Sequence, residues 1–167
     1  MTPATTVSHY IVSKQKDENI FFYAPESEVA VINAALGASY TGARVMIGTA
    51  AGGFDLMTEG LSFEGIAELP LVALVGQRGG PSTGVPTYNA QGDLNMVLYG
   101  GHGEFPRIVV APGDAKECIE CTNQMFYLAH KFRTVGIVLF DKNVGESKYG
   151  FDEAPKILQV PRNITIK

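Results

Sequence analysis

Short apolar runs alternate along the chain with longer stretches in which apolar residues recur every three or four positions. The apolar runs occupy residues 19–24, 43–47, 71–75, 107–111 and 135–140. Runs of this length with few polar positions are typical of strands that are buried on both faces of a parallel sheet. The alternation of strands and helices predicts an α/β fold in which a doubly wound, mostly parallel sheet carries helices on both faces.

The stretches between these runs carry helix signals. Thr2 and Pro3 predict a helix start, with Thr as the N-cap and Pro at the first helical position. A helix is expected from residue 25 to Gly42, with the carboxylate of Glu28 in its first turn, where the helix dipole favours negative charge. The other helices are expected over residues 54–69, over residues 93–99, and from a capping box at Asp114 and Glu117 to about residue 133.

No internal repeat or linker divides residues 1–167, so we expect a single domain that ends in a polar tail over residues 141–167. One short strand is expected in this tail, near residues 157–160. The chain begins with a helix signal where a doubly wound fold normally offers a strand, so we expect the sheet to lack its first strand. Because an uncovered sheet edge is usually paired, we expect a homo-oligomer or an obligate partner.

Composition narrows the functional classes. The hydrophobic content of 46% and the charged content of 18% are typical of a globular domain. The net charge of −4 argues against a nucleic-acid partner, because phosphate binding needs clustered Lys and Arg. No apolar run reaches the roughly 18 residues that a membrane helix needs, so no membrane partner is expected. Two cysteines without a secretory signal favour the reducing cytoplasm.

A glycine-rich turn from Gly48 to Gly53, which includes Thr49 and Gly52, is expected between the second apolar run and the helix that follows. Free N–H groups at such a helix start can bind an anion. The glycine spacing matches neither the Walker A pattern nor G-x-G-x-x-G. On these residues alone, a plain tight turn is the favoured interpretation.

Arg78 and Glu28 are charged residues for which both a functional and a plain structural interpretation are considered. Arg78 opens a loop rich in glycine and proline over residues 78–91, directly after an apolar run. Its guanidinium could bind a carboxylate in bidentate fashion or form a surface ion pair, and the residues alone leave both open. Glu28 could serve only as a dipole partner, or, if buried, could hydrogen-bond a heterocyclic nitrogen.

Two other pairs carry weaker signals. Cys118 and Cys121 form a C-x-x-C within a helix, but a metal or iron–sulfur site needs about four ligands, so we interpret both as structural thiols. His102 and Glu104 precede the strand at residues 107–111, and we expect them at the same sheet edge as the loops above. Without a third partner they are weak evidence for an acid–base couple.

Several segments, in the same order and spacing, resemble the α subunit of 2-oxoacid:ferredoxin oxidoreductases, most closely the 2-oxoglutarate type. These segments are MTPAT, residues 26–72, QRGGPSTGVPT, QGDL, GHGEFPRIVVAP and IVLFDKNVGES, and they extend to about residue 147. The resemblance implies the pyrimidine-binding domain of a thiamin diphosphate enzyme. It also implies oxidative decarboxylation of a 2-oxoacid with coenzyme A, which yields acyl-CoA, CO2 and reduced ferredoxin.

The resemblance further implies that the cofactor site is shared. In this family the diphosphate end and its Mg2+ belong to a partner β subunit, which also carries a [4Fe–4S] cluster. The chain is therefore expected to be inactive alone, to hold no metal itself, and to reach ferredoxin through the complex.

The resemblance also assigns roles to individual residues. Glu28 falls on the family glutamate that hydrogen-bonds the aminopyrimidine ring and favours its imino tautomer. Arg78 falls on the arginine that binds the substrate carboxylate, and Thr2 falls on the threonine of a Tyr-Pro-x-Thr-Pro motif at the substrate. The other residues expected at the cofactor are Gly48, Thr49 and Gly52.

The chain departs from the family pattern in three places. It starts inside the Tyr-Pro-x-Thr-Pro motif, its Ser-Gly-Pro-Gly type turn reads Ala-Ala-Gly-Gly over residues 50–53, and the second domain is missing after about residue 148. These departures indicate a fragment, a split-gene product or a shortened relative. The alternative function is a truncated, non-catalytic paralogue that keeps the fold as a binding or assembly module.

Overall fold

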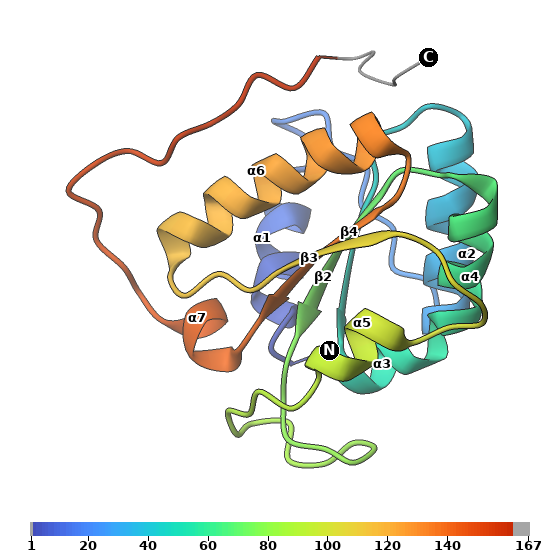
Figure 1. Cartoon of the computed structure of the whole chain (residues 1–167). Helices are drawn as coiled ribbons and strands as arrows, with labels where there is room; N and C mark the ends of the chain where they lie inside the picture. Colours follow the sequence, from blue (N-terminus) through green and yellow to red (C-terminus); the bar gives the residue numbers. More distant parts are fainter. Residues whose placement is uncertain (1, 162–167) are drawn as a thin grey trace.

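The computed structural model describes residues 2–161 and centres on a four-stranded sheet in which every strand pair is parallel. The strands lie in the order β1–β2–β4–β3 (Figure 1). All residues of β2 and β4, the two central strands, are buried, which explains their continuous aliphatic sequences. The strand bounds are β1 (Met46–Ala50), β2 (Leu71–Gly76), β3 (Arg107–Val110) and β4 (Val135–Phe140).

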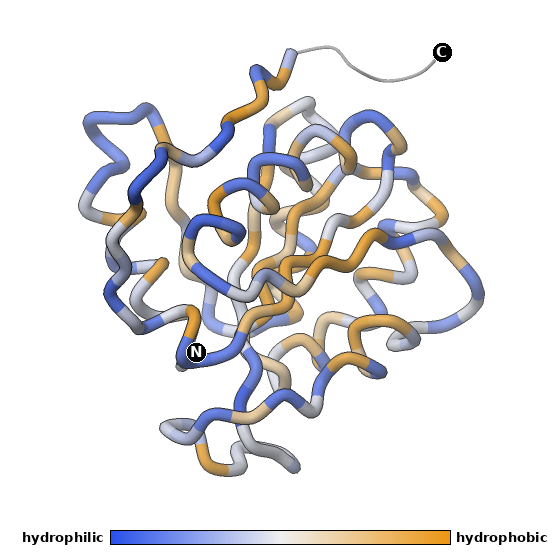
Figure 2. The backbone as a smooth tube through the Cα atoms, turned by 60° about the vertical axis from the view of Figure 1, so that its left-hand side comes forward, coloured by the Kyte–Doolittle hydropathy of each residue, from blue (hydrophilic) through white to orange (hydrophobic). Residues whose placement is uncertain are grey.

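Helices cover both faces of this sheet, and each face has its own apolar core. One core packs the sheet against α2 (Glu28–Tyr40), α3 (Ala51–Leu56), α4 (Thr58–Ala67) and α5 (Leu94–Tyr99). The other packs it against α1 (Thr5–Lys14), α6 (Ala115–Phe132) and α7 (Lys142–Glu146). Apolar residues accordingly run through the central strands in Figure 2. The predicted doubly wound α/β fold is confirmed.

The first core contains fully buried side chains from three helices, among them Ile32, Phe54 and Leu61. Each such side chain stabilises the fold by roughly 1.5–3 kcal/mol relative to exposure. The backbone of Gly60 approaches Ile32 so closely that a Cβ there would lie 2.6 Å from Ile32 Cγ1. This close approach fixes α2 against α4.

Three elements differ from the sequence-based expectation, each at a helix end. The strand expected at residues 43–47 is β1, which starts at Met46, because the N–H groups of residues 41–43 donate to carbonyls of α2. The helix expected over residues 54–69 is two helices, since Met57 ends α3 and begins α4. The N-terminal helix starts at Thr5, after Ala4 rather than Thr2 as N-cap.

The strand expected at residues 19–24 is wrong. This segment contains no regular structure, and two of its three aromatic side chains are exposed, Phe21 to 88% and Tyr23 to 62%. Phe21 and Tyr23 stack on each other at 6.5 Å between ring centroids instead of entering a core. Their apolar character predicted a buried strand. The prediction fails because no strand within residues 2–161 lies beside this segment to pair with it.

The tail contains the helix α7 but no strand near residues 157–160, contrary to expectation. It runs along α6, as the red trace in Figure 1 shows. Side chains of α6 hold its backbone: Glu120 Oε1 accepts from the N–H of Lys156 at 2.8 Å, and Asn123 Oδ1 accepts from that of Leu158 at 2.7 Å. Hydrogen bonds from helix side chains thus replace the expected strand pairing.

Within residues 2–161, no helix has both the length and the apolar character needed to cross a bilayer.

Candidate functional site

A cavity of ≈ 620 Å³ lies at the carboxyl ends of β1 and β2. It is enclosed by the starts of α2 and α3 and by the long loop of residues 77–93, which hangs below the sheet in Figure 1. In open α/β sheets, ligands bind outside the carboxyl ends of the strands, and the cavity volume is within the usual range of ligand sites. Its lining includes Glu28, Gly52, Gly53, Arg78, Ser82 and Asp93.

Glu28 is the first residue of α2 and is half-buried. Ser27 caps this helix, because its extended backbone lets its hydroxyl accept a hydrogen bond from the N–H of Ala30 at 3.3 Å. The cap fixes the point at which the helix begins and therefore the position of the next residue. The result is a carboxylate held at the wall of the cavity.

Gly53 provides the surface on which this carboxylate rests. A Cβ at Gly53 would lie 2.8 Å from Oε1 of Glu28 and would also overlap Oγ1 of Thr49. Only glycine allows both side chains to approach this close. Sequence analysis noted Gly53 in the turn but did not select it as a site residue. The available signal was the placement of two glycines in one helix turn, where glycine is unfavourable.

Arg78 enters the cavity from the loop that follows β2. Its Nη1 donates to the carbonyl oxygen of Thr2 at 3.3 Å. Its Nε is buried and has no hydrogen-bond partner among the residues described. A guanidinium has five N–H donors in a planar fork, so this side chain keeps donors for an incoming carboxylate.

Asp93 lines the same cavity, and sequence analysis missed it by interpreting it as part of a short helix. Its Oδ2 is buried and unpartnered within the described part of the chain. Burial raises the pKa of this carboxyl, while the backbone N–H and the charge of Arg78 act in the opposite direction. The cavity therefore brings together Glu28, Arg78 and Asp93, which are separated in the sequence by up to 65 positions.

The other predicted residues have different positions. Gly52 lines the cavity, and a Cβ there would lie 3.5 Å from the carbonyl oxygen of Ser82 in the long loop. The predicted glycine turn is wrong, because β1 runs directly into α3. Gly48 consequently lies inside β1, and Thr49 is buried there beside Gly53. Thr2 meets Arg78 through its backbone carbonyl rather than its hydroxyl.

His102 and Glu104 do not belong to this site. They lie in the exposed segment before β3, at the amino ends of the parallel strands. The prediction that they lie at the same sheet edge as Arg78 is therefore wrong. Cys118 and Cys121 are unpaired and do not line the cavity. Burial, with nearby acidic groups, raises the pKa of Cys118 to about 11, which keeps it a thiol and fits a structural role.

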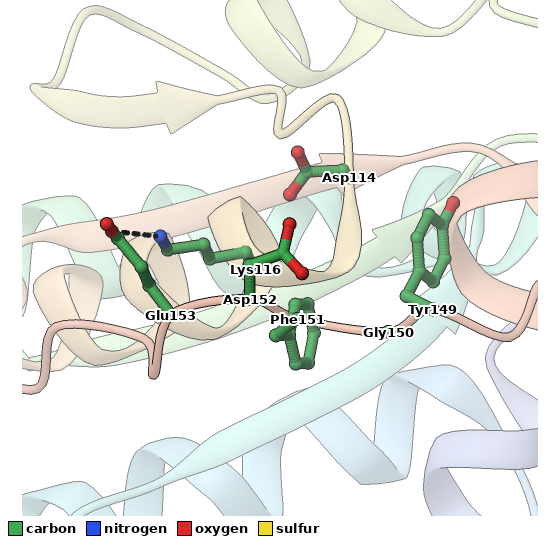
Figure 3. Close-up of a pocket in the computed structure, with 7 residues that line it drawn as sticks. All are labelled: Asp114, Lys116, Tyr149, Gly150, Phe151, Asp152 and Glu153. Carbon is green, nitrogen blue, oxygen red and sulfur yellow. Dashed lines mark hydrogen bonds and ion pairs between the residues drawn. The ribbon is translucent and has the colours of Figure 1, made fainter.

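A second hollow, of ≈ 380 Å³, lies between the start of α6 and the tail (Figure 3). It is lined by acidic side chains and by Lys116, which pairs with Glu153 at 3.5 Å. Asp114 is already used as the cap of α6, since its Oδ1 accepts from the N–H of Glu117 at 2.8 Å. Because Lys116 and Glu153 pair with each other and Asp114 caps the helix, the cavity at the strand ends is the better candidate site.

Metal ligands do not gather at either place. Across residues 2–161, no group of three or more His, Cys, Asp or Glu side chains is arranged to hold a metal ion. The first cavity is instead lined by one guanidinium, that of Arg78, and by several carboxylates. This arrangement suits an organic ligand with a carboxylate group and a ring nitrogen.

Comparison with known proteins identifies relatives over nearly all of this chain. Residues 1–158 match the family model described as pyruvate flavodoxin/ferredoxin oxidoreductase, thiamine diP-binding. The chain is 41% identical over 159 residues to the α subunit of 2-oxoacid:ferredoxin oxidoreductase 1 from Sulfurisphaera tokodaii, covering 88% of this chain. It is 38% identical over 148 residues to 2-oxoglutarate synthase subunit KorA from Archaeoglobus fulgidus, covering 89% of this chain.

A solved structure has the same fold. The 2-oxoglutarate:ferredoxin oxidoreductase from Magnetococcus marinus, with 2-oxoglutarate, coenzyme A and succinyl-CoA bound, matches with a TM-score of 0.84 at 40% identity over 87% of this chain. The match covers 25% of that chain, and the chain spans 25% and 43% of the two sequence relatives above. The likeness therefore concerns one part of longer proteins.

Proposed function

The chain belongs to the pyruvate flavodoxin/ferredoxin oxidoreductase, thiamine diP-binding family, and from this premise we propose that it supplies the pyrimidine-binding half of a thiamin diphosphate site. The whole enzyme would be a 2-oxoacid:ferredoxin oxidoreductase. The observation that carries the proposal is the arrangement of Glu28 and Arg78 on the wall of one cavity at the carboxyl ends of the strands. The Glu28 carboxylate would bind a pyrimidine nitrogen, and the Arg78 guanidinium would bind the carboxylate of a 2-oxoacid.

The cavity wall fits the pyrimidine end of the cofactor. Glu28 rests on Gly53, at a place where any Cβ would displace its carboxylate, so the backbone shapes the wall around this acid. Glu28 would hold a proton at a ring nitrogen and so set the tautomer of the ring. The chemistry that thiamin diphosphate supplies when bound is an electron sink for decarboxylation.

Arg78 would hold the carboxylate of the 2-oxoacid. The buried, unpartnered Nε supports this role, because a guanidinium with free donors is strongly favoured to bind a carboxylate. Thr2 would support the substrate indirectly, by accepting a hydrogen bond from Arg78 through its carbonyl. Gly52 would let the loop of residues 77–93 close over the start of α3, while Thr49 and Gly48 would serve the cofactor wall from inside β1.

The substrates and products follow from the relatives. We propose 2-oxoglutarate with coenzyme A as substrates, because one relative is named a 2-oxoglutarate synthase subunit and the solved relative has both molecules bound. The products would be succinyl-CoA, CO2 and reduced ferredoxin. Mg2+ and a [4Fe–4S] cluster would be held by a β subunit, and the complex would work in the cytoplasm, where unpaired thiols persist.

Exposed apolar side chains on helices that pack against one side of the sheet support association with other chains. Leu56 of α3 and Tyr99 of α5 are 57% and 77% exposed, and Ile66 of α4 is 83% exposed. Clusters of exposed apolar groups usually mark protein interfaces. We propose that this face meets a β subunit or a second copy of the chain.

The test is turnover by the complex that a tag on this chain recovers from its native cell. We expect 2-oxoglutarate and coenzyme A together to drive reduction of ferredoxin or of a low-potential dye, with thiamin diphosphate bound to the complex. Recovery of the chain alone, without bound thiamin diphosphate or turnover of any 2-oxoacid, would instead favour the non-catalytic assembly module.

A further inference from the structure

We propose that Asp93 is a positioning residue that sets the orientation of Arg78 and, through it, of the 2-oxoacid carboxylate. This inference rests on the proposed function, because it concerns the same cavity. Asp93 and Arg78 both line that cavity, although they are 15 positions apart in the sequence. Each carries a buried polar atom with no hydrogen-bond partner among residues 2–161: Oδ2 in Asp93 and Nε in Arg78.

The backbone of Asp93 is tied to the sheet next to Arg78. Its N–H donates to Oε1 of Gln77 at 3.3 Å. Gln77 is only 6% exposed, and its own N–H donates to the carbonyl of Phe140 at the end of β4, at 2.7 Å. Both ends of the long loop are therefore anchored on one buried residue, which keeps Asp93 beside Arg78.

The side chain of Asp93 is not used for helix capping. Asp93 occupies the N-cap position of α5, where an aspartate normally accepts a hydrogen bond from the second or third N–H of the helix. No such bond is present, and the backbone has φ −100° and ψ 4° rather than the extended conformation of a capping residue. Asp93 lines the cavity with its Oδ2 buried and unpartnered among the described residues, and such burial of a charged group is unfavourable.

Both the backbone N–H and the guanidinium of Arg78 act on the charge of Asp93. The N–H of Arg78 stabilises the ionised form of Asp93, as does the guanidinium charge, against the larger effect of burial, which raises the pKa of Asp93. The guanidinium of Arg78 forms no ion pair with an acidic side chain among the described residues. The guanidinium is restrained without losing the donor fork that a substrate carboxylate needs.

This restraint matters because the cavity is otherwise acidic. Glu28 and Asp55 also line it, and Arg78 is the one cation among its described lining residues. A substrate carboxylate is repelled by three acids and attracted by one guanidinium. The direction of that guanidinium therefore decides where the carboxylate can bind.

The experiment compares Asp93→Ala and Asp93→Asn with wild type in the complex recovered through the tagged chain. Asparagine keeps an oxygen that can accept from the N–H of Arg78, whereas alanine removes it. Glu104→Gln is the matched control, because it removes a carboxylate that is exposed and outside the cavity. The measurements are steady-state turnover of 2-oxoglutarate, its equilibrium binding by calorimetry without coenzyme A or ferredoxin, and the thiamin diphosphate content.

We expect Asp93→Ala to raise KM and Kd for 2-oxoglutarate about tenfold with kcat changed less than about threefold, which is the signature of lost ground-state binding. Asp93→Asn should stay within about threefold of wild type in all three constants, and Glu104→Gln should match wild type. All variants should retain their thiamin diphosphate.

Other outcomes overturn the inference. Unchanged KM and Kd in Asp93→Ala would show that Asp93 does not position the carboxylate. Failure of both variants to assemble or to retain thiamin diphosphate would make Asp93 purely structural. If wild type itself neither binds nor turns over 2-oxoacids, the proposed function fails and this inference fails with it.

Discussion

The carboxylate of Glu28 lies directly against the backbone of Gly53, so that a Cβ on this glycine would be 2.8 Å from Oε1 and 2.9 Å from Cγ of the glutamate. The contact joins the first turns of α2 and α3 at the carboxyl end of β1. It explains why a poor helix former occupies the first turn of α3. The glycine keeps the proposed cofactor acid in place.

Gly53→Ala is expected to displace Glu28 from the cavity wall. The new methyl group would overlap both Glu28 and Thr49, and the wall has no room on either side. We expect the affinity of the assembled complex for thiamin diphosphate to fall at least about tenfold, as measured by titration of the cofactor-free complex.

Gly37→Ala is the matched control for this substitution. Gly37 is exposed in the same helix as Glu28, and a Cβ there would meet nothing within 4 Å. Because alanine is the better helix former, this variant should be more stable by about 0.5–1 kcal/mol with unchanged cofactor affinity. Equal cofactor affinity in both variants would contradict the role given to Gly53.

Two helix caps separate stability from function. Ser27→Ala and Asp114→Ala should each lower the free energy of unfolding by about 1 kcal/mol, because each removes the acceptor of an N-terminal hydrogen bond. Only Ser27 precedes Glu28, so only Ser27→Ala should also weaken thiamin diphosphate binding. Urea unfolding and cofactor titration of both variants test this, and a parallel loss of affinity in Asp114→Ala would refute it.

Glu64 is a fully buried acid outside the candidate site. Both carboxylate oxygens lack hydrogen-bond partners among the described residues. Arg107, the nearest cation, already donates to the carbonyls of Val97 and Gly100. Burial raises the pKa of Glu64 from 4.5 to about 8, and the charge of Arg107 only partly opposes this.

This buried acid predicts a pH-dependent stability. The folded chain holds the Glu64 proton more tightly than the unfolded chain. The contribution of this proton to the free energy of unfolding is therefore fully present below pH 4.5 and is lost as the pH rises toward 8. The loss is on the order of 4 kcal/mol. Glu64→Gln should remove this slope and be more stable than wild type at pH 8, whereas Glu59→Gln, on the exposed face of α4, should keep it.

Urea unfolding at several pH values between 5 and 8 gives the comparison. The free energies of unfolding of wild type and Glu64→Gln should converge as the pH falls. Parallel curves over this range would show that Glu64 is ionised in the folded chain, contrary to the burial argument.

The sheet could be predicted from the sequence where burial is complete. β2 and β4 lie within one residue of their expected bounds, because both faces of each strand are apolar. Local apolar character predicted a strand wrongly at Phe21 and Tyr23, whose exposure depends on the absence of a neighbouring strand within residues 2–161. It also placed β1 three residues early, because the end of α2 uses the backbone that the strand would need.

The candidate site was less accessible to sequence reasoning. Physical reasoning left the role of Arg78 open and favoured a plain helix-dipole role for Glu28. Only the family resemblance selected both as site residues. Gly53 and Asp93 were not selected, since their importance depends on what approaches them in space: the side chain of Glu28 in one case and the loop of Arg78 in the other. Burial of a charge and proximity of a backbone are properties of the fold rather than of a local pattern.

The central claim is that Glu28 serves the cofactor, and one substitution tests it most directly. Glu28→Gln should leave the complex assembled but lower kcat for 2-oxoglutarate at least about 100-fold. A glutamine amide lacks the negative charge with which the Glu28 carboxylate would hold a proton at the ring nitrogen of the cofactor. Glu26→Gln, two residues earlier and exposed, should turn over at the wild-type rate. Turnover by Glu28→Gln equal to that of Glu26→Gln would contradict the account.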